Sequence, residues 1–351
     1  MKLGIIGLPQ SGKTTLFNAV SGQEAAVGDY SRAEHRAVVK VPDERVENLY
    51  SLIKSKKLTH AEIEFLDSTG FTGKGKNSSG ELGNIHELRL LDAFAIVVDY
   101  FTPDAVPEQD ISAIVDEMIL ADMILIENNL DKLDRSIKLT GKMDRARELE
   151  LLKICREALE NEKMLSEIGL SESDKKELRG YCFLTLKPQL IVLNISEDKL
   201  PDAEQINADF SKFKKENIRD ISVICGQLQM ELAQLSEEEQ REFLDDMNIK
   251  KSAHERFIQK SYELLGLISF FTIGAPETRA WTIKKGTTAP KAAGIIHTDF
   301  ERGFIRAEVA TYEDYMKYKT LPALKAAAKL HVEGKEYIVN DGDVILFLFN
   351  V

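Results

Sequence analysis

The residues best suited to chemistry form a glycine-rich loop near the N-terminus. This loop matches G-x-x-x-x-G-K-[ST], a phosphate-binding pattern. Its glycines would let backbone N–H groups turn inward onto phosphate oxygens, while Lys13 reaches the β- and γ-phosphates and the Thr14 hydroxyl binds Mg²⁺. The residues that we expect to contact a nucleotide here are Gly7, Leu8, Pro9, Gln10, Ser11, Gly12, Lys13, Thr14 and Thr15.

The sequence on both sides of this loop supports the functional interpretation. Residues 2–6 form an apolar run typical of a buried strand, and residues 14–20 read as the start of a helix. A chance glycine turn would need neither of these flanks. The loop therefore predicts triphosphate binding in an α/β fold of the P-loop type.

A second motif lies where the metal side of such a site is expected. The strand predicted at residues 61–66 ends in D-S-T-G, a D-x-x-G pattern that begins at Asp67. Asp67 could hold a Mg²⁺-bound water, and the Gly70 N–H could sense the γ-phosphate. Phe71 follows, where many GTPases carry a water-orienting Gln, and its ring cannot hydrogen-bond to water. Lys13, Gly70 and Phe71 are the residues that we expect around the hydrolytic step.

A nucleotide switch would also supply a hydroxyl to Mg²⁺ from the loop that follows the first helix. That loop is predicted at residues 21–36, and Ser31 is the candidate metal ligand. A solvated loop serine with no metal role explains the residue equally well. The residues alone leave both interpretations open.

The base side of the site is predicted after a later strand, at residues 190–193. The sequence continues N-I-S-E from Asn194, where GTPases carry N-K-x-D. Glu197 replaces the Asp that accepts hydrogen bonds from guanine, and Ile195 replaces the stacking Lys. Asn194 remains able to reach a purine N7 or an exocyclic amine, so adenine becomes at least as plausible as guanine. Gly226 begins the loop where a base would be cradled.

The middle of the chain changes to a helical period. Apolar residues recur with alternating steps of four and three, which is typical of a helix packed against another helix. A second helical run covers residues 144–166, so we expect an antiparallel hairpin with a basic tip. A solvated face and a prong that meets RNA phosphates both explain this tip. The spaced residues are Ile119, Met123, Ile126, Leu130, Leu133 and Ile137, and the cations are Lys132, Arg135, Lys138, Lys142, Arg145 and Arg147.

The C-terminal part, residues 267–351, consists of short β-rich runs and turns. Between residues 277 and 306 it has six cations and three anions, although the whole chain has a net charge of −12. Trp281 and Phe304 could stack on bases beside these cations, which would suit RNA contact. Core aromatics with surface lysines explain the same pattern. The cations are Arg279, Lys284, Lys285, Lys291, Arg302 and Arg306.

Bulk composition excludes several classes of protein. With 351 residues, 43% hydrophobic and 30% charged, the chain is typical of soluble proteins with two or three domains. No apolar run approaches the length of a membrane span. Its three cysteines are scattered singly, which indicates neither a metal site nor a disulfide framework and suits a reducing cytoplasm. The net negative charge argues against a protein that simply coats nucleic acid.

Taken together, these motifs resemble the YchF / Obg-like ATPase family along essentially the whole chain. The resemblance rests on N-x-x-E and on segments that read VPDERV, EMILAD, GAPETRAWTIKKG and VNDGDVILF. It implies a GTPase-type fold with a helical insert and a C-terminal TGS domain. It also implies Mg²⁺-dependent hydrolysis that prefers ATP to GTP, and binding to the ribosome and its RNA. Family members also carry a hydrophobic residue after D-x-x-G, which Phe71 provides.

Some positions depart from the family pattern. Gln10 stands where the family has an Asn that is tied to a K⁺ site in related GTPases, so K⁺ activation is doubtful. Ser31 falls where the family has a Thr in its first switch. The loop at residues 101–112 lacks a His that is proposed to help hydrolysis in the family. These departures predict a nucleotide binder whose hydrolysis is slow or differently activated.

We therefore predict a doubly wound, mostly parallel α/β sheet of the P-loop NTPase type, formed by residues 1–113 and 182–266. Residues 114–181 would form a helical hairpin insert, and residues 267–351 an α+β, β-grasp-like TGS domain. The expected protein is a cytoplasmic, monomeric ATPase switch on the ribosome and ribosomal RNA, with no DNA or membrane partner. A guanine-specific GTPase and a nearly non-hydrolysing RNA adaptor are the alternatives.

Overall fold

The computed structural model describes residues 1–22, 35–68, 85–140, 145–246 and 252–350. The chain forms two compact units. Unit 1 comprises Met1–Ala37 and Glu64–Lys260, and unit 2 comprises Val38–Ile63 and Ser261–Val351. Within the described ranges, no helix is both long enough and apolar enough to cross a bilayer.

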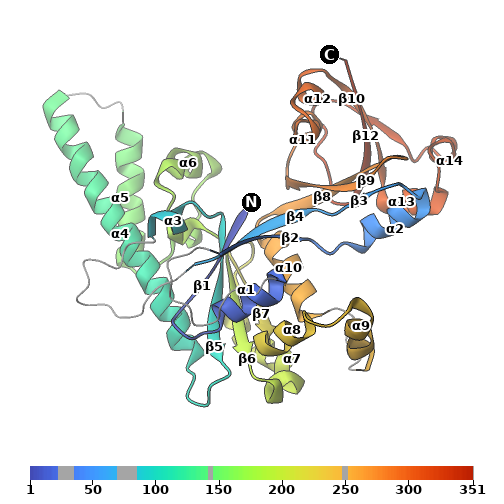
Figure 1. Cartoon of the computed structure of the whole chain (residues 1–351). Coiled ribbons are helices and arrows are strands. Elements are labelled where there is room, and N and C mark those ends of the chain that lie inside the picture. The colour runs from blue at the N-terminus through green and yellow to red at the C-terminus, as the bar shows by residue number, and fades with distance from the viewer. Residues whose placement is uncertain (23–34, 69–84, 141–144, 247–251, 351) are drawn as a thin grey trace. The chain divides into compact units, whose positions relative to one another are not determined.

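A six-stranded sheet organises unit 1, in the order β2-β4-β1-β5-β6-β7 (Figure 1). Strands β4, β1, β5, β6 and β7 pair in parallel with their neighbours. The predicted doubly wound, mostly parallel sheet is therefore confirmed. The strands are β1 (Lys2–Gly7), β2 (His35–Lys40), β4 (Glu62–Asp67), β5 (Ala93–Tyr100), β6 (Gln189–Ile195) and β7 (Arg219–Ile224).

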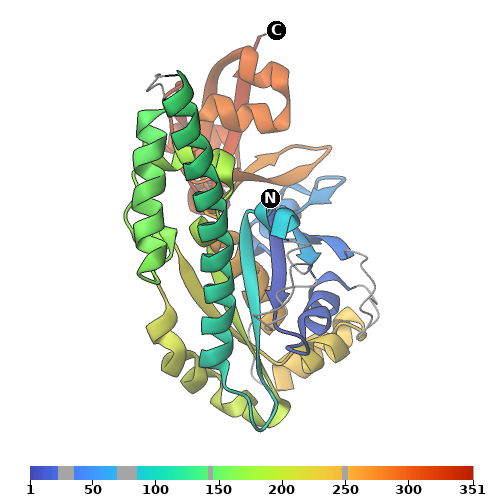
Figure 2. The ribbon, with the colours of Figure 1, turned by 90° about the vertical axis from the view of Figure 1, so that its left-hand side faces the viewer.

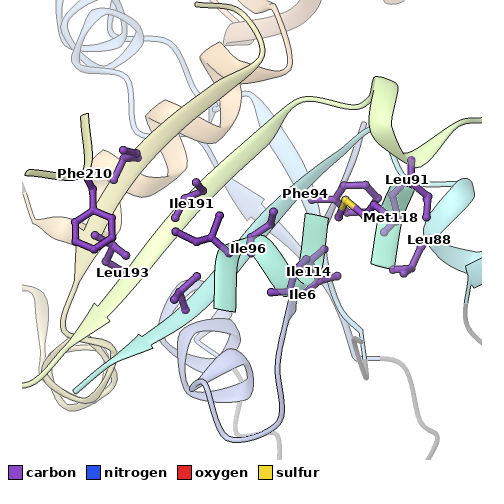
Figure 3. Packing of buried hydrophobic residues seen from close by; sticks show 14 of the residues in the cluster. Ile6, Leu88, Leu91, Phe94, Ile96, Ile114, Met118, Ile191, Leu193 and Phe210 are labelled. Carbon is purple, nitrogen blue, oxygen red and sulfur yellow. The ribbon is translucent and has the colours of Figure 1, made fainter. Parts of the chain in front are cut away.

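The core of unit 1 explains why its strands read as apolar runs, since strands covered on both faces need no polar alternation. Ile6 of β1 and Phe94 of β5 are fully buried and pack with Ile114 and Met118 of α4 (Pro107–Thr140) (Figure 3). This packing fixes the strands whose carboxyl ends carry the predicted site.

Further helices of unit 1 connect these strands. The α-helices are α1 (Lys13–Ser21), α3 (Ile85–Arg89), α5 (Ala146–Glu160), α6 (Glu172–Glu177), α7 (Ala203–Asp209), α8 (Gly226–Leu232), α9 (Glu237–Asp246) and α10 (Ala253–Leu264), the last of which continues into unit 2. The short 3₁₀ helices are η2 (Leu165–Glu167), η3 (Leu178–Tyr181), η4 (Leu184–Leu186), η5 (Glu197–Asp202) and η6 (Phe210–Phe213).

Helices α4 and α5 lie side by side (Figures 1 and 2). Ile119, Met123, Ile126, Leu130 and Leu133, five of the residues at the four-three spacing, pack in this contact, and α4 begins at Pro107. Together the two helices form their own apolar cluster. Its buried members include Ile119, Ile126, Leu130 and Leu133 from α4 and Leu151, Leu152 and Leu159 from α5.

Unit 2 contains a second six-stranded sheet, in the order β11-β10-β12-β8-β9-β3. Its strands are β3 (Leu58–Thr59), β8 (Leu267–Ile273), β9 (Thr278–Lys284), β10 (Phe304–Thr311), β11 (His331–Glu333) and β12 (Asp343–Phe349). Its helices are α2 (Glu44–Ile53), α11 (Ala289–Ile296), α12 (Thr298–Arg302), α13 (Tyr312–Tyr318) and α14 (Leu321–Ala326). The assignment of this unit as a TGS domain stays a prediction.

The aromatic residues of unit 2 belong mainly to its core. Phe304 is 6% exposed and packs in the cluster that contains Phe270. Trp281 is half-buried, stacks on Phe270, and donates its indole N–H to Thr272 Oγ1 over 2.8 Å. Of the two readings that the sequence left open, the structure favours core aromatics.

Residues 38–63 are grouped with the C-terminal residues in unit 2, although the two ends of this segment belong to β2 and β4 of the first sheet. Leu58 of β3 pairs in parallel with Thr278 of β9. Arg45 of α2 donates to Asp341 Oδ2 over 2.7 Å and to the helix N-cap Asp43 over 2.9 Å. The sequence-based boundary at residues 1–113 does not separate this segment.

Candidate nucleotide-binding site

The phosphate loop connects β1 to α1, and two of its positions require glycine. A Cβ on Gly7 would lie 2.3 Å from the Val97 carbonyl oxygen. Gly12 has φ 91°, and a Cβ there would lie 2.2 Å from Nδ2 of Asn194. Both distances are shorter than real Cβ contacts allow, so the loop can come this close to β5 and β6 only without side chains.

The rest of the loop is partly strained and partly buried. Gln10 has φ 66°, a left-handed conformation that costs a non-glycine residue about 1–2 kcal/mol. Leu8 is half-buried against the core, whereas Pro9 is exposed. The Ser11 hydroxyl is buried and has no hydrogen-bond partner among the described residues. Strain and an unpaired hydroxyl concentrate here, as is common at binding loops.

Lys13 folds back onto its own loop. Its Nζ donates to the Leu8 carbonyl oxygen over 2.7 Å. Burial lowers the pKa of Lys13, and the nearby Asp67 carboxylate raises it in part. The ammonium group is therefore held inside the loop, where phosphate oxygens could replace the carbonyl oxygen as its acceptor.

Thr14 and Asp67 meet as the motifs predict. The Thr14 hydroxyl, on the first turn of α1, donates to Asp67 Oδ2 at the end of β4 over 3.0 Å. Asp67 is 8% exposed, and this burial raises its pKa, while Thr14, Lys13 and His35 lower it in part. The carboxylate is thus short of the charge stabilisation that a cation would give.

These two side chains fit Mg²⁺, because Mg²⁺ prefers oxygen ligands and keeps several waters. No group of three or more His, Cys, Asp or Glu side chains could hold a metal in the parts of the chain that the structure describes. A metal beside Thr14 and Asp67 would therefore also depend on phosphate oxygens. The other expected residues of this side, Ser31, Gly70 and Phe71, lie outside the described residues.

On the base side, Asn194 joins the phosphate loop to the start of α8, where the sequence had predicted a loop at Gly226. Its Nδ2 donates to the Ser11 carbonyl oxygen over 3.1 Å, and its Oδ1 accepts the Gly226 N–H over 3.0 Å. Each amide atom keeps one further hydrogen-bonding capacity, since the NH₂ has two hydrogens and the oxygen two lone pairs. Thr15 also lies here, with its Cγ2 3.6 Å from a Cβ position on Gly226.

Ile195 and Glu197, which replace the Lys and the Asp of N-K-x-D, differ in exposure. Ile195 is 2% exposed and belongs to the core at the end of β6. Glu197 is exposed at the start of η5. Ile195 thus cannot provide the stacking surface that a Lys gives in N-K-x-D, whereas Glu197 remains free to point toward a base.

Sequence reasoning missed residues at the tip of β5. The Phe101 ring reaches within 3.9 Å of a Cβ position on Gly12, and Lys199 of η5 donates to the Tyr100 carbonyl oxygen over 2.7 Å. His35, whose ring centroid lies 6.1 Å from that of Phe17, was missed as a neighbour of Asp67. No local motif marks these positions, and only the pairing of the strands brings them to the site.

Some cations of the hairpin and of unit 2 form ion pairs with carboxylates. Arg147 pairs with Glu150 and Asp174, and Arg145 pairs with Glu148. In unit 2, Arg302 pairs with Asp299 over 2.7 Å. Lys284, Lys285 and Arg306 are exposed on β9, in the turn after it, and on β10.

Comparisons with known proteins agree with this geometry. A family model described as "50S ribosome-binding GTPase" matches residues 2–129, and the YchF-GTPase_C model, described as a protein of unknown function, matches residues 267–350. A protein of Bacillus subtilis called "Ribosome-binding ATPase YchF" is 39% identical over 363 residues, covering 99% of each chain. Its Escherichia coli O157:H7 namesake is 38% identical, covering 100% of this chain and 99% of its own.

A solved structure is similar along nearly the whole chain. The structure of the Schizosaccharomyces pombe YchF GTPase superposes with a TM-score of 0.84 at 30% sequence identity. The match covers 99% of this chain and 97% of the yeast protein. The similarity therefore extends through both units and is not limited to the phosphate loop.

Proposed function

The chain belongs to the YchF family of P-loop NTPases, and on this premise we propose that it is a Mg²⁺-dependent ATPase that binds ribosomes as a nucleotide-dependent switch. The Thr14–Asp67 hydrogen bond carries the proposal, because it joins the phosphate loop to the D-x-x-G strand end over 3.0 Å. The similar bacterial proteins are called ribosome-binding ATPases. Their full-length match supports the same activity and partner here.

The described residues have distinct roles in this mechanism. The loop between Gly7 and Gly12 holds phosphate oxygens through backbone N–H groups, and the N-terminus of α1 favours their negative charge. Lys13 binds the β- and γ-phosphates. Thr14 and Asp67 would hold Mg²⁺, Thr14 through its hydroxyl and Asp67 through a bound water. When bound, Mg²⁺ would neutralise the charge that develops on the phosphates.

The base preference follows from the same geometry. Guanine selection in N-K-x-D depends on an Asp that accepts two hydrogen bonds and a Lys that stacks on the base. Here Glu197 has a longer and exposed side chain, and Ile195 is buried. Asn194 is fixed by Ser11 and Gly226, and its remaining N–H suits an acceptor such as a purine N7. These features favour ATP over GTP.

The test is a pair of titrations of the full-length protein with ATP and GTP in Mg²⁺, followed by turnover with and without ribosomes. We expect tighter binding of ATP, slow basal turnover, and stimulation by ribosomes. Lys13→Ala should abolish triphosphate binding, whereas the exposed Lys153→Ala on α5 should not. A clear preference for GTP would overturn the ATP assignment, and intact binding without any stimulation would favour a non-hydrolysing adaptor.

We also propose that exposed cations of unit 2 contact ribosomal RNA. Reversing the charge of Lys284, Lys285 and Arg306 should weaken ribosome association and make its salt dependence shallower. A matched triple reversal of Lys317, Lys319 and Lys325 in the same unit is the control. Equal effects of the two triple variants would contradict a specific contact at β9 and β10.

The remaining features of the proposal concern organisation and setting. Residues 114–181 would act as the helical insert and residues 267–351 as a TGS-type domain. The three free cysteines suit a reducing cytoplasm, and we propose a monomer that binds neither DNA nor a membrane. Gln10 does not favour a K⁺ site, so turnover in K⁺ and Na⁺ should be equal.

A further inference from the structure

The ends of β5 and β6 meet beside the phosphate loop. In the parallel register, Asp99 lies opposite Asn194 and Tyr100 lies opposite Ile195. A Cβ placed on Gly12 would lie 2.2 Å from Asn194 Nδ2 and 3.9 Å from a ring carbon of Phe101, the residue after Tyr100. The Phe101 ring and the Asn194 amide therefore both approach the phosphate loop at Gly12.

The peptide group between Tyr100 and Phe101 sets the direction in which the Phe101 side chain leaves the backbone. Its N–H, on Phe101, donates to Asp99 Oδ1 over 2.9 Å. Its carbonyl oxygen belongs to Tyr100 and accepts a hydrogen bond from Lys199 Nζ over 2.7 Å. Because both ends of a planar group are held, its rotation is prevented. Asp99 also accepts from the Thr102 N–H and hydroxyl, so the turn itself is closed.

Lys199 makes a second interaction with the same partner. Its Nζ lies 4.1 Å from the centroid of the Tyr100 ring, and that ring in turn packs edge-on against Phe210 at 5.9 Å between centroids. A hydrogen bond from an ammonium group to a carbonyl and a cation–π contact therefore act together. Lys199 comes from η5, the short helix that also carries Glu197.

We propose that Lys199 is a positioning residue. It holds the tip of β5 against η5, the segment that follows Asn194, and thereby sets discrimination between purine bases. It does the work that the stacking Lys of N-K-x-D does directly, which Ile195 cannot do because it is buried. Lys199 acts through Phe101: it fixes the ring relative to Asn194 and Gly12. The inference rests on the proposed function, since it assigns the base side of the same site.

The experiment uses the full-length protein and compares Lys199→Met with Lys212→Met. Methionine keeps the apolar stem and removes the ammonium group. Lys212 is the matched control, because its Nζ lies 5.4 Å from the Phe213 centroid and pairs with Glu108 instead of a backbone carbonyl at the tip of β5. Lys199→Arg, which keeps the charge and the donors, tests for rescue. Thermal midpoints show whether each variant is folded.

Lys199→Met should weaken the binding of ATP and ADP by about tenfold and by the same factor, because the lost contact lies on the base side. The ratio of ATP affinity to GTP affinity should fall by about threefold or more, while kcat at saturating ATP stays within about twofold. Lys212→Met should leave all of these values within about twofold, and Lys199→Arg should restore most of the ratio.

An unchanged affinity ratio in a folded Lys199→Met would overturn the inference, and so would a loss of ATP binding without a loss of ADP binding. The outcome is read as a change of ratio between variant and wild type, whichever purine the wild type prefers. A wild type that prefers GTP would therefore overturn the proposed ATP preference, while a changed ratio would still support Lys199. A wild type that binds no purine nucleotide would overturn both.

Discussion

Two buried aspartates of unit 1 differ in how completely they are hydrogen-bonded. Asp122, on α4, is 0% exposed and accepts from Arg89 Nη1 and from the N–H groups of Leu184 and Thr185, over 2.7–3.1 Å. The Thr185 hydroxyl adds a fourth hydrogen bond over 2.8 Å. Asp67, at the phosphate loop, is 8% exposed and has the Thr14 hydroxyl as its donor in the described part of the chain.

This difference separates a structural carboxylate from one that is available to a ligand. Asp122 is satisfied by its protein neighbours, and it connects α3, α4 and η4. Burial raises the pKa of Asp67, which means that its charge is not fully compensated by the protein. Burial alone would not distinguish the two residues, whereas their hydrogen-bond partners do.

Removing Asp122 should have the largest effect. Asp122→Ala leaves the N–H groups of Leu184 and Thr185 without their acceptor and removes the carboxylate that pairs with the buried end of Arg89, so we expect the free energy of unfolding to fall by about 3–5 kcal/mol. Urea unfolding measures this loss. Asp116→Ala, at an exposed position on the same helix, should change stability by less than about 0.5 kcal/mol. Equal losses would show that Asp122 is not the residue that holds this junction.

Asp67→Asn should lower turnover without lowering the free energy of unfolding, in contrast to Asp122→Ala. If Asp67 has its proposed role of orienting a metal-bound water, turnover in Mg²⁺ should fall by about 10–100-fold. The free energy of unfolding should stay the same or rise, since the variant removes a buried charge that the protein does not fully compensate. Steady-state turnover and urea unfolding measure the two effects. If Asp67→Asn instead lost stability and kept its turnover, Asp67 would be a structural carboxylate like Asp122.

The pH dependence of Asp67 provides a finer test. Burial raises its folded-state pKa above the unfolded value of about 3.9. Its contribution to stability is therefore fully present below the unfolded value and is lost as the pH rises through the folded value. The stability advantage of Asp67→Asn over the wild type should shrink as the pH falls from about 7 to about 4. An advantage that does not depend on pH would contradict the raised pKa.

The smallest expected effect is a change in the rate at which the cysteine thiols react. Cys182 is exposed, and its carbonyl oxygen accepts from Arg89 over 3.2 Å. Burial raises the pKa of Cys155 to about 12 and also raises that of Cys225. One thiol per folded chain should therefore react rapidly with an aromatic disulfide reagent. Cys155 should react faster in Asp122→Ala than in Asp116→Ala. Equal reaction rates would show that the contacts of Asp122 do not protect Cys155.

Local motifs predicted that the phosphate loop and the end of β4 lie together, and the binding of a nucleotide there stays a prediction. The spacing from Gly7 to Thr14 needs only a strand and a helix start, and Asp67 follows at the end of an adjacent parallel strand. The meeting of Thr14 and Asp67 could therefore be expected from chain order alone. The helix pair was also predictable, since its apolar seam repeats over several turns.

The base side and the boundary between units were less predictable for a physical reason. Lys199 reaches the tip of β5 because its Nζ donates to the carbonyl oxygen of Tyr100, which lies 99 residues away in the chain. Arg45 contacts Asp341 across 296 residues. Such partners carry no local signature, since a lysine or arginine at these positions would suit any exposed surface equally well. The strand β3 is only two residues long, too short for a periodic signal.

The pairing of β3 with β9 also affects how the chain must fold during synthesis. Leu58 cannot find Thr278 until 220 further residues have been made. At about 5–20 residues per second, this takes roughly 10–45 s. Throughout that interval α2 and β3 are already synthesised, but β9, with which β3 pairs, is not. A nascent chain stopped before Thr278 should therefore leave residues 41–61, which lie between β2 and β4, open to proteases and chaperones.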